Sequence, residues 1–543
     1  MDPRPNPNVP RPGRATRESS ISMPAVSNTS EPTTTEHRFL FVDTQDDVSQ
    51  VFGVGREKMA FLSKLAHQRR KKESIARLRS TQRTKSQQTA ATQENPTQQQ
   101  QEGLRQALRR QGSRVLTGYL GQGYVDPFDT SSVVMTDAMN MYFHHFRVQL
   151  APTAVPFDGA WEGSLWAQRS ATIPALRYIG LFLAAGNKAL LETSHGVAQS
   201  VNSQTSRDAI RLRIEAIKAL NSLLRHPNSA VAQSTMLCVS NMRHCEALHA
   251  QFTAIEAHIK GLDTLINLGG GLESMEHTIL SVIYQGDISC AALKDSQPCY
   301  RILPCFRSKV LHEAEMFRRR SRSYEYGIAI PRSISCSGTR FYKSAWNLEL
   351  DAELKNALSA ASRVFVHFEM GKRFPSLVKP THNYLSIILL HDLLSLRCLQ
   401  NNNDLNDPLR RALFVYTYQR IWNFSCFPVT QYIMDGLKES LIPRFTYIQA
   451  TAPDLLLWIL FIGALGSQGY VSHSWFATTL REVAGSLDLV EWPAAESIFV
   501  QFFYSDHPGY RRGEDLWKQV MSQSHLDIVP RVSEYISEIP RAK

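Results

Sequence analysis

Apolar residues recur three and four positions apart over most of the chain beyond about residue 126. The first clear segment is 206–225, which contains Ile210, Ile214, Ile217, Leu220 and Leu224. The second is 243–268, which contains Leu248, Phe252, Ile255, Ile259, Leu262 and Ile266. This spacing places the apolar side chains on one stripe of an α-helix. Pro227 ends the first predicted helix, and Gly269–Gly271 ends the second, where glycine takes a left-handed cap.

The same period predicts helices in most of the remaining chain. They are expected at 164–192, 229–242, 272–293, 350–369, 381–400, 407–425, 452–466, 473–487 and 494–504. Residues 318–349, which begin with clustered arginines and continue with Ser, Gly and Pro, predict a longer loop. Alternating patterns of the strand type are almost absent. The sequence therefore predicts an all-α, multi-helix domain whose consecutive helices are joined by short turns.

The longest apolar run is Leu455–Leu465. Its length falls well short of the roughly 20 residues that a membrane crossing needs, so we expect a buried core helix and no membrane partner. Nearby aromatic residues have two interpretations, a ligand pocket between helices or ordinary core, and core positions are far more common. These aromatic residues are Trp458, Phe461, Trp475 and Phe476.

The N-terminal quarter differs in composition from the rest. Residues 1–36 are rich in Pro, Ser, Thr and Asn, a composition typical of a disordered tail. Residues 37–85 hold a short apolar segment and a basic arm, and 86–125 form a Gln- and Thr-rich linker. The helical domain is expected at 126–530. The start of the sequence has no apolar stretch of the signal-peptide kind, so we expect an intracellular, reduced protein.

The basic arm carries most of the net charge. Residues 56–85 contain eleven Lys and Arg against Glu57 and Glu73, which gives +9 of the total +11. The densest positions are Arg69, Arg70, Lys71, Lys72, Arg77 and Arg79. Three interpretations stay open: a nuclear import signal, a nucleic-acid contact that weakens with salt, and a solvated helix face. An import receptor is the favoured partner.

Catalytic and metal-binding patterns are weak. Cys238, Cys245 and His249 are spaced so that a continuous helix would bring them to one side, but a structural zinc site needs a fourth ligand. Gly118, Gly121 and Gly123 do not have dinucleotide-binding spacing, and no phosphate loop or nucleophile elbow occurs. The sequence predicts neither an enzyme nor a bound cofactor or metal.

Four local motifs resemble the fungal-specific transcription factor domain, the helical regulatory region of zinc-cluster regulators. They are Arg38–Asp43 with His67–Lys72, Asp126–Asp129 with Met141–Phe146 and Ala151–Pro152, His258–Leu262 with Leu268–Leu272, and Phe502–Tyr504 with Asp506 and Leu516–Trp517. The resemblance covers about residues 38–523. It is closest to a subgroup that has the regulatory region without the zinc cluster.

The resemblance implies an all-helical fold, a nuclear location and a role in transcriptional control, often of metabolic or secondary-metabolite genes. One departure limits it. The zinc cluster needs six cysteines in two C-x2-C pairs, whereas this chain has no cysteine before Cys238. Sequence-specific DNA binding therefore does not carry over.

The sequence thus favours a nuclear transcriptional regulator that acts through protein contacts with transcriptional partners, with direct DNA contact and oligomeric state left open. Two alternatives are a cytoplasmic helical scaffold and a ligand-binding module.

Overall fold

The structure is a computed structural model. It describes residues 132–155, 157, 159–194, 203–324, 334, 336–396, 403–422, 424, 426–504 and 513–522. The predicted tail, basic arm and linker lie outside these residues.

The described part of the chain is built from helices, and it contains no strand. The first series is α3 (Asp137–His145), η1 (Phe146–Leu150), α4 (Ala151–Ala154), α5 (Gly159–Thr172), α6 (Pro174–Ser194), α7 (Gln204–Leu224), α8 (Pro227–Ala230), α9 (Gln233–Leu248), α10 (Phe252–Leu268), η2 (Leu272–Ser274) and α11 (His277–Lys294). The second is α12 (Pro304–Tyr324), α14 (Thr339–Lys343), η3 (Ala345–Glu349), α15 (Ala352–Arg373), η4 (Pro375–Leu377), η5 (Pro380–Asn383), α16 (Tyr384–Ser395) and α17 (Asn406–Arg420). The third is α18 (Val429–Leu441), η6 (Ile442–Arg444), α19 (Phe445–Thr451), α20 (Pro453–Gly466), α21 (His473–Ser486), α22 (Trp492–Phe499) and α23 (Gly513–Ser522). The all-α prediction is confirmed.

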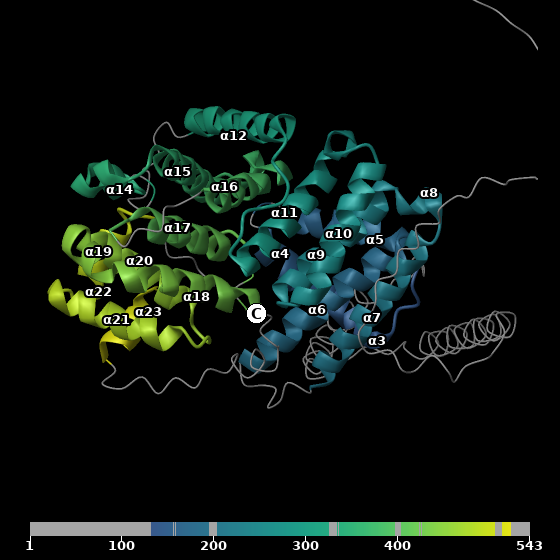
Figure 1. Ribbon diagram of the computed structural model, residues 1–543, viewed down its shortest axis with the longest axis horizontal. Helices are drawn as coiled ribbons and strands as arrows, with labels where there is room; N and C mark the ends of the chain where they lie inside the picture. The colour runs from purple at the N-terminus through teal and green to yellow at the C-terminus, as the bar shows by residue number, and fades with distance from the viewer. Residues whose placement is uncertain are drawn as a thin grey trace, which may run out of the picture. The chain divides into compact units, whose positions relative to one another are not determined.

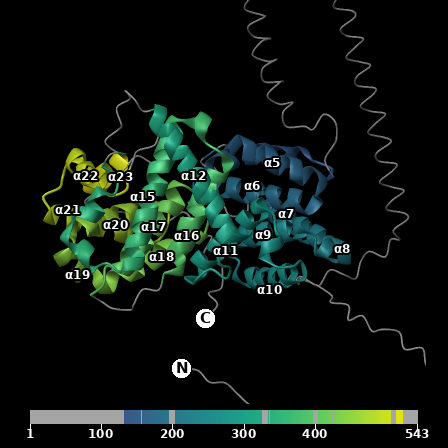
Figure 2. The same cartoon turned by 90° about the horizontal axis from the view of Figure 1, so that it is seen from above.

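The helices pack mainly against neighbours in sequence, with a few long-range partners (Figures 1 and 2). Helices α6 and α7 pack against each other, as do α20 and α21. Helix α11 contacts α9 on one side and α16 and α18 on the other. Helix α17 then joins α16 to α20. The apolar stripes of these helices meet in one hydrophobic core.

Helix α20 shows why an uninterrupted apolar run becomes a central helix. Ten consecutive residues from Leu455 to Ala464 are buried, nearly all of them completely. Pro453 stands in its first turn, where no backbone donor is needed. A helix that is apolar on every face is stable only when other helices surround it. Among the described helices, none combines the length and the hydrophobicity that a membrane-spanning segment requires.

The prediction of one helix over 243–268 is wrong, because the structure separates α9 and α10 at His249–Gln251. Ala250 has a φ of 56°, the left-handed conformation. The N–H of Gln251 donates to the carbonyl of Glu246 (2.9 Å), and that of Ala250 donates to Ala247 (3.1 Å). This is the Schellman pattern of a helix end, usually made with glycine. The apolar period simply continues across the break.

The glycine cap predicted at the end of α10 is confirmed. Gly270 has a φ of 92°, and the N–H of Gly271 donates to the carbonyl of Ile266 (2.9 Å).

The predicted loop at 318–349 is also wrong in part. Helix α12 continues through its arginines to Tyr324, and α14 and η3 occupy 339–343 and 345–349. The predicted helix at 164–192 is two helices, α5 and α6, divided at Ile173 because the backbone before Pro174 disfavours helix. Helix α18 was not among the predicted segments.

Candidate functional site

A cavity of about 550 Å³ lies between α12, α15 and α16. This volume is within the range of about 300–1,000 Å³ that is typical of small-molecule sites. Its lining is Leu311, Ala314, Glu315, Phe317, Arg318, Ser321, Ala360, Ser362, Arg363, Val364, Val366, His367, Met370, Leu385, Ile388 and Leu389. Most of these side chains are apolar.

Short side chains explain why the three helices leave space between them. Ala314 and Ser321 on α12 and Ala360 and Ser362 on α15 reach only a short way from their helices. The floor is closed by larger, buried residues such as Leu389, which is 1% exposed, and Phe317, which is 3% exposed. The space therefore extends from the surface down to the core.

One buried polar side chain stands in the wall of this cavity. His367 is 7% exposed and packs against the rings of Phe317, His382 and Phe157, with ring centroids 4.3, 4.7 and 5.8 Å away. Burial, with a smaller contribution from His382, lowers the pKa of His367 to about 3, so the imidazole is neutral at physiological pH. Its Nε2 atom has no hydrogen-bond partner within the described structure.

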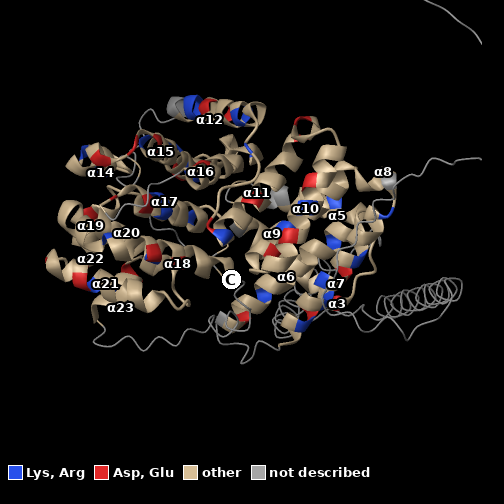
Figure 3. Ribbon diagram, in the orientation of Figure 1, with Lys and Arg blue, Asp and Glu red and all other residues tan. Residues whose placement is uncertain are grey.

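The mouth of the cavity is charged. On α12, Glu315 accepts two hydrogen bonds from Arg318 (2.7 Å each) and one from Arg319 (2.9 Å). These bonds, first those from Arg318, lower the pKa of Glu315 to about 2. Arg363 on α15 is exposed, and within the described residues it forms no ion pair. Helix α12 carries both basic and acidic residues (Figure 3), and the lining of the cavity contains two arginines against one glutamate, so the mouth has a net positive charge.

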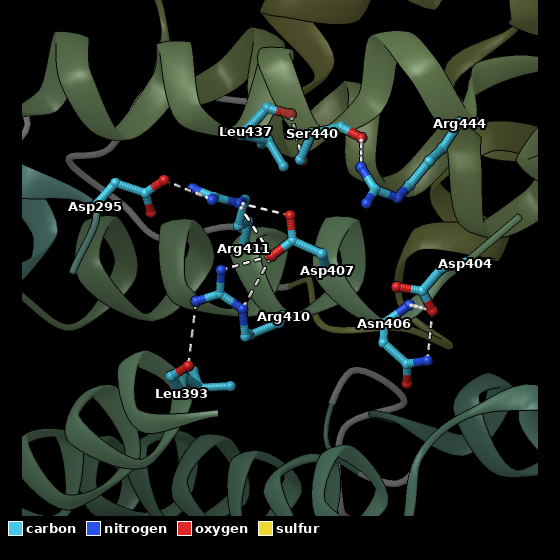
Figure 4. Close-up of polar contacts among 10 residues, drawn as sticks. All are labelled: Asp295, Leu393, Asp404, Asn406, Asp407, Arg410, Arg411, Leu437, Ser440 and Arg444. Atoms are coloured by element: carbon cyan, nitrogen blue, oxygen red, sulfur yellow. Dashed lines mark hydrogen bonds and ion pairs between the residues drawn. The ribbon is translucent and has the colours of Figure 1, made fainter. Parts of the chain in front are cut away.

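A second polar cluster lies at the start of α17 (Figure 4). Asp407 accepts hydrogen bonds from Arg410 (2.6 Å) and Arg411 (3.0 Å), and Arg411 also reaches Asp295 (2.7 Å), the left-handed residue that ends α11. Arg410 donates to the carbonyl of Leu393 on α16 (3.3 Å). Burial alone would raise the pKa of Asp407, but Arg411 and Arg410 outweigh it and lower that pKa. The cluster ties α11, α16 and α17 together.

A third cluster is buried between α9 and α11. The side chains of Arg243 and Asp287 are 0% and 1% exposed, with Nη1 and Oδ1 3.8 Å apart. Arg243 Nη2 donates to the carbonyl of Ile283 (2.7 Å), and Asp287 Oδ2 accepts from the N–H of Tyr300 (2.9 Å). A Cβ at Gly286 would lie 3.3 Å from Arg243 Nε, so the glycine makes room for the guanidinium. This pair is enclosed by protein and has the character of a structural ion pair.

The cysteine and histidine residues weighed for zinc are part of the core. Cys238 and Cys245 are buried, and burial raises the pKa of both thiols, to about 12 for Cys238. His249 Nδ1 bonds to the carbonyl of Cys245 (2.8 Å), and its ring stacks on Phe182. Over the described residues, no group of three or more His, Cys, Asp or Glu side chains is placed to hold a metal ion.

The aromatic residues weighed for a pocket are also packed in the core. Trp458, Phe461 and Phe476 are fully buried, and Trp458 Nε1 donates to the carbonyl of Phe503 (3.2 Å). Trp475 is partly buried under the ammonium group of Lys438.

The cavity between α12, α15 and α16 was not predicted. A signal was present, because Phe306, Val310, Phe317 and Ser321 follow helical spacing and are all buried. The basic positions that were predicted as a site lie outside the described residues: Arg69, Arg70, Lys71, Lys72, Arg77 and Arg79. No family model, curated protein or solved structure matches the chain.

Proposed function

We propose that this protein is a non-enzymatic transcriptional regulator whose helical domain binds partners and whose basic arm directs it to the nucleus. One observation carries the proposal. The excess positive charge is concentrated in residues 56–85, whereas the helical domain is nearly balanced in charge and keeps several of its buried charged groups in ion pairs. Such a division suits a chain in which one segment contacts an acidic receptor or a polyanion and the other associates with proteins. The motif resemblance supports the same function.

The buried titratable groups of the helical domain support a non-catalytic role. His244, His258 and His367 are neutral because burial lowers the pKa of each to about 3. A general base is most effective with a pKa near the working pH. The thiols of Cys238 and Cys290 have the opposite shift, since burial raises the pKa of each to about 12, which suppresses the nucleophilic thiolate.

The import hypothesis is tested with a fluorescent fusion of the full chain. The test variant replaces Arg69, Arg70, Lys71 and Lys72 with alanine. A matched control replaces four exposed cations of the helical domain, Arg211, Lys218, Lys260 and Lys518, so that the net charge changes equally. We expect the test variant to remain in the cytoplasm and the control to accumulate in the nucleus. Cytoplasmic location of the unmodified fusion would instead favour a scaffold.

DNA contact by the arm is tested separately by chromatin occupancy of the tagged protein with and without residues 56–85. Binding of the purified full chain to duplex DNA is expected to weaken steeply between 50 and 200 mM salt if several of these cations contact phosphates, as is general for such contacts. Occupancy that is unchanged without the arm would assign DNA targeting to a partner protein.

A ligand-binding module is the second candidate function. The cavity between α12, α15 and α16 favours it, and a regulator that senses a metabolite would combine both functions.

A further inference from the structure

We propose that the cavity between α12, α15 and α16 binds a small amphiphilic acid, a molecule with an apolar body and one anionic group. The inference rests on the proposed function for its regulatory meaning, since such a ligand would serve as the effector of the helical domain. The binding itself follows from two separate observations about the cavity.

The first observation is the apolar and deep interior. Leu385, Ile388 and Leu389 of α16 and Val364 and Met370 of α15 line it, and all five are less than a tenth exposed. A ligand that fills this space removes its own apolar surface and that of the lining from water, which stabilises the complex. Because the walls are nearly buried side chains of three helices, the space is a pocket and not a flat patch. A compact molecule fits such a pocket better than a helix of a partner protein does.

The second observation is the charge at the mouth. Arg363 is exposed and forms no ion pair within the described structure, while the one acid of the lining, Glu315, is already held by Arg318 and Arg319. A carboxylate at this position would gain a charge-assisted hydrogen bond without displacing an existing pair. A cationic head group would meet arginines instead. The rim therefore selects for an anion.

The test uses the purified full chain and the fluorescent probe 1-anilinonaphthalene-8-sulfonate, which is itself an apolar anion. Dodecanoate and dodecan-1-ol, each below its aggregation concentration, compete for the probe. We expect dodecanoate to displace it at a concentration at least tenfold lower than dodecan-1-ol. Equal competition by the alcohol would overturn the anionic part of the proposal.

Two variants fill the cavity from opposite walls, Ala360→Trp on α15 and Ala314→Trp on α12. Each is expected to lose the probe signal while its melting temperature and helical circular dichroism stay near those of the unmodified chain. Two walls are used because one tryptophan could prevent folding. Retained probe binding by a folded variant of either kind would overturn the site.

The charge is tested by Arg363→Glu against a matched control, Lys260→Glu, an exposed cation on α10. Arg363→Glu is expected to raise the dodecanoate concentration needed at least tenfold and to leave dodecan-1-ol unchanged. An equal effect of Lys260→Glu would show a general charge effect and overturn the proposal.

Two further competitors are tested in the same experiment. They are vesicles of dioleoylphosphatidylglycerol and an acidic amphipathic peptide. Displacement by either one in place of dodecanoate would assign the surface to a membrane or to a protein partner. Nuclear accumulation of the Ala360→Trp fusion is expected to be normal. A failure of ligand binding is therefore distinguishable from a failure of the import hypothesis.

Discussion

Two regions of the helical domain hold charged groups in different surroundings. One is the contact between α9 and α11, and the other is the cavity between α12, α15 and α16. In the first region Arg243 and Asp287 are enclosed and face each other as an ion pair, and each also makes a hydrogen bond to a backbone group. In the second region Arg363 stands at a cavity mouth and forms no ion pair within the described residues. Opposite charges that face each other in the core are part of the fold, whereas a charged group beside open space is available to a ligand. The difference predicts distinct responses to mutation.

The largest expected effect is loss of stability in mild acid, which both regions share. Burial lowers the pKa of His244, His258 and His367 to about 3 and that of His249 and His382 to about 4. In the unfolded chain their pKa is about 6.5, so below that pH the unfolded state binds protons that the folded state does not. The stability is fully present above about pH 6.5 and is lost as pH falls towards the folded pKa values.

Each such histidine costs roughly 1.4 kcal/mol at pH 5.5, so the five together are expected to cost on the order of 5 kcal/mol or more. The free energy of unfolding in urea, measured between pH 7.5 and 5.5, checks this. His258→Phe and His367→Phe should each reduce the pH dependence. A free energy of unfolding that stays constant to pH 5.5 would contradict the neutral, buried state of these side chains.

The next largest effect concerns the enclosed ion pair. Arg243→Ala leaves Asp287 buried without its partner, so we expect a loss of about 3–5 kcal/mol. The double change Arg243→Met with Asp287→Leu removes both charges and should recover most of this loss, because apolar side chains then fill the same space. Urea denaturation measures both. A loss below about 1 kcal/mol in Arg243→Ala would mean that water reaches this pair.

A smaller effect, an increase in the free energy of unfolding, is expected where α9 ends. Ala250 is buried in the left-handed conformation, which costs an L-residue roughly 1–2 kcal/mol. Ala250→Gly removes this cost but increases the freedom of the unfolded chain, so a net gain of about 0.5–1 kcal/mol is expected. Ala254→Gly within α10 is the matched control and should lose a similar amount. Thermal unfolding of the unmodified chain and of both variants shows whether Ala250→Gly is stabilised and Ala254→Gly destabilised.

The smallest effect on stability is expected at the cavity mouth. Arg363→Ala should change the free energy of unfolding by less than about 0.5 kcal/mol, as is usual for an exposed side chain without a partner. Arg410→Ala is the matched control, since its guanidinium bonds Asp407 and the carbonyl of Leu393, and it should lose about 2 kcal/mol. A large loss at Arg363 would assign that arginine to the fold and remove it from the ligand site.

The apolar pattern by itself determined that the domain is all-α and where several helices lie. Leu455–Leu465 indicated α20, and the glycines at 269–271 indicated the end of α10, because periodicity and backbone freedom are local properties. The pattern did not reveal the break at Ala250, since the apolar spacing continues across it and the hydrogen bonds of a helix end decide the conformation. The arginines of α12 favoured a loop, although the buried Phe317 and Ser321 beside them follow helical spacing.

Only the tertiary structure decided which polar groups are partners and where space remains. Arg243 and Asp287 are on different helices, and the cavity is formed by short side chains of α12 and α15 above α16. Such proximities depend on how helices pack across long stretches of sequence, which no local spacing encodes. The basic arm could be predicted from composition, because the net charge of a segment is the sum of the charges of its residues. The pocket could be found only from the packed helices, because the empty volume depends on how several helices are arranged together.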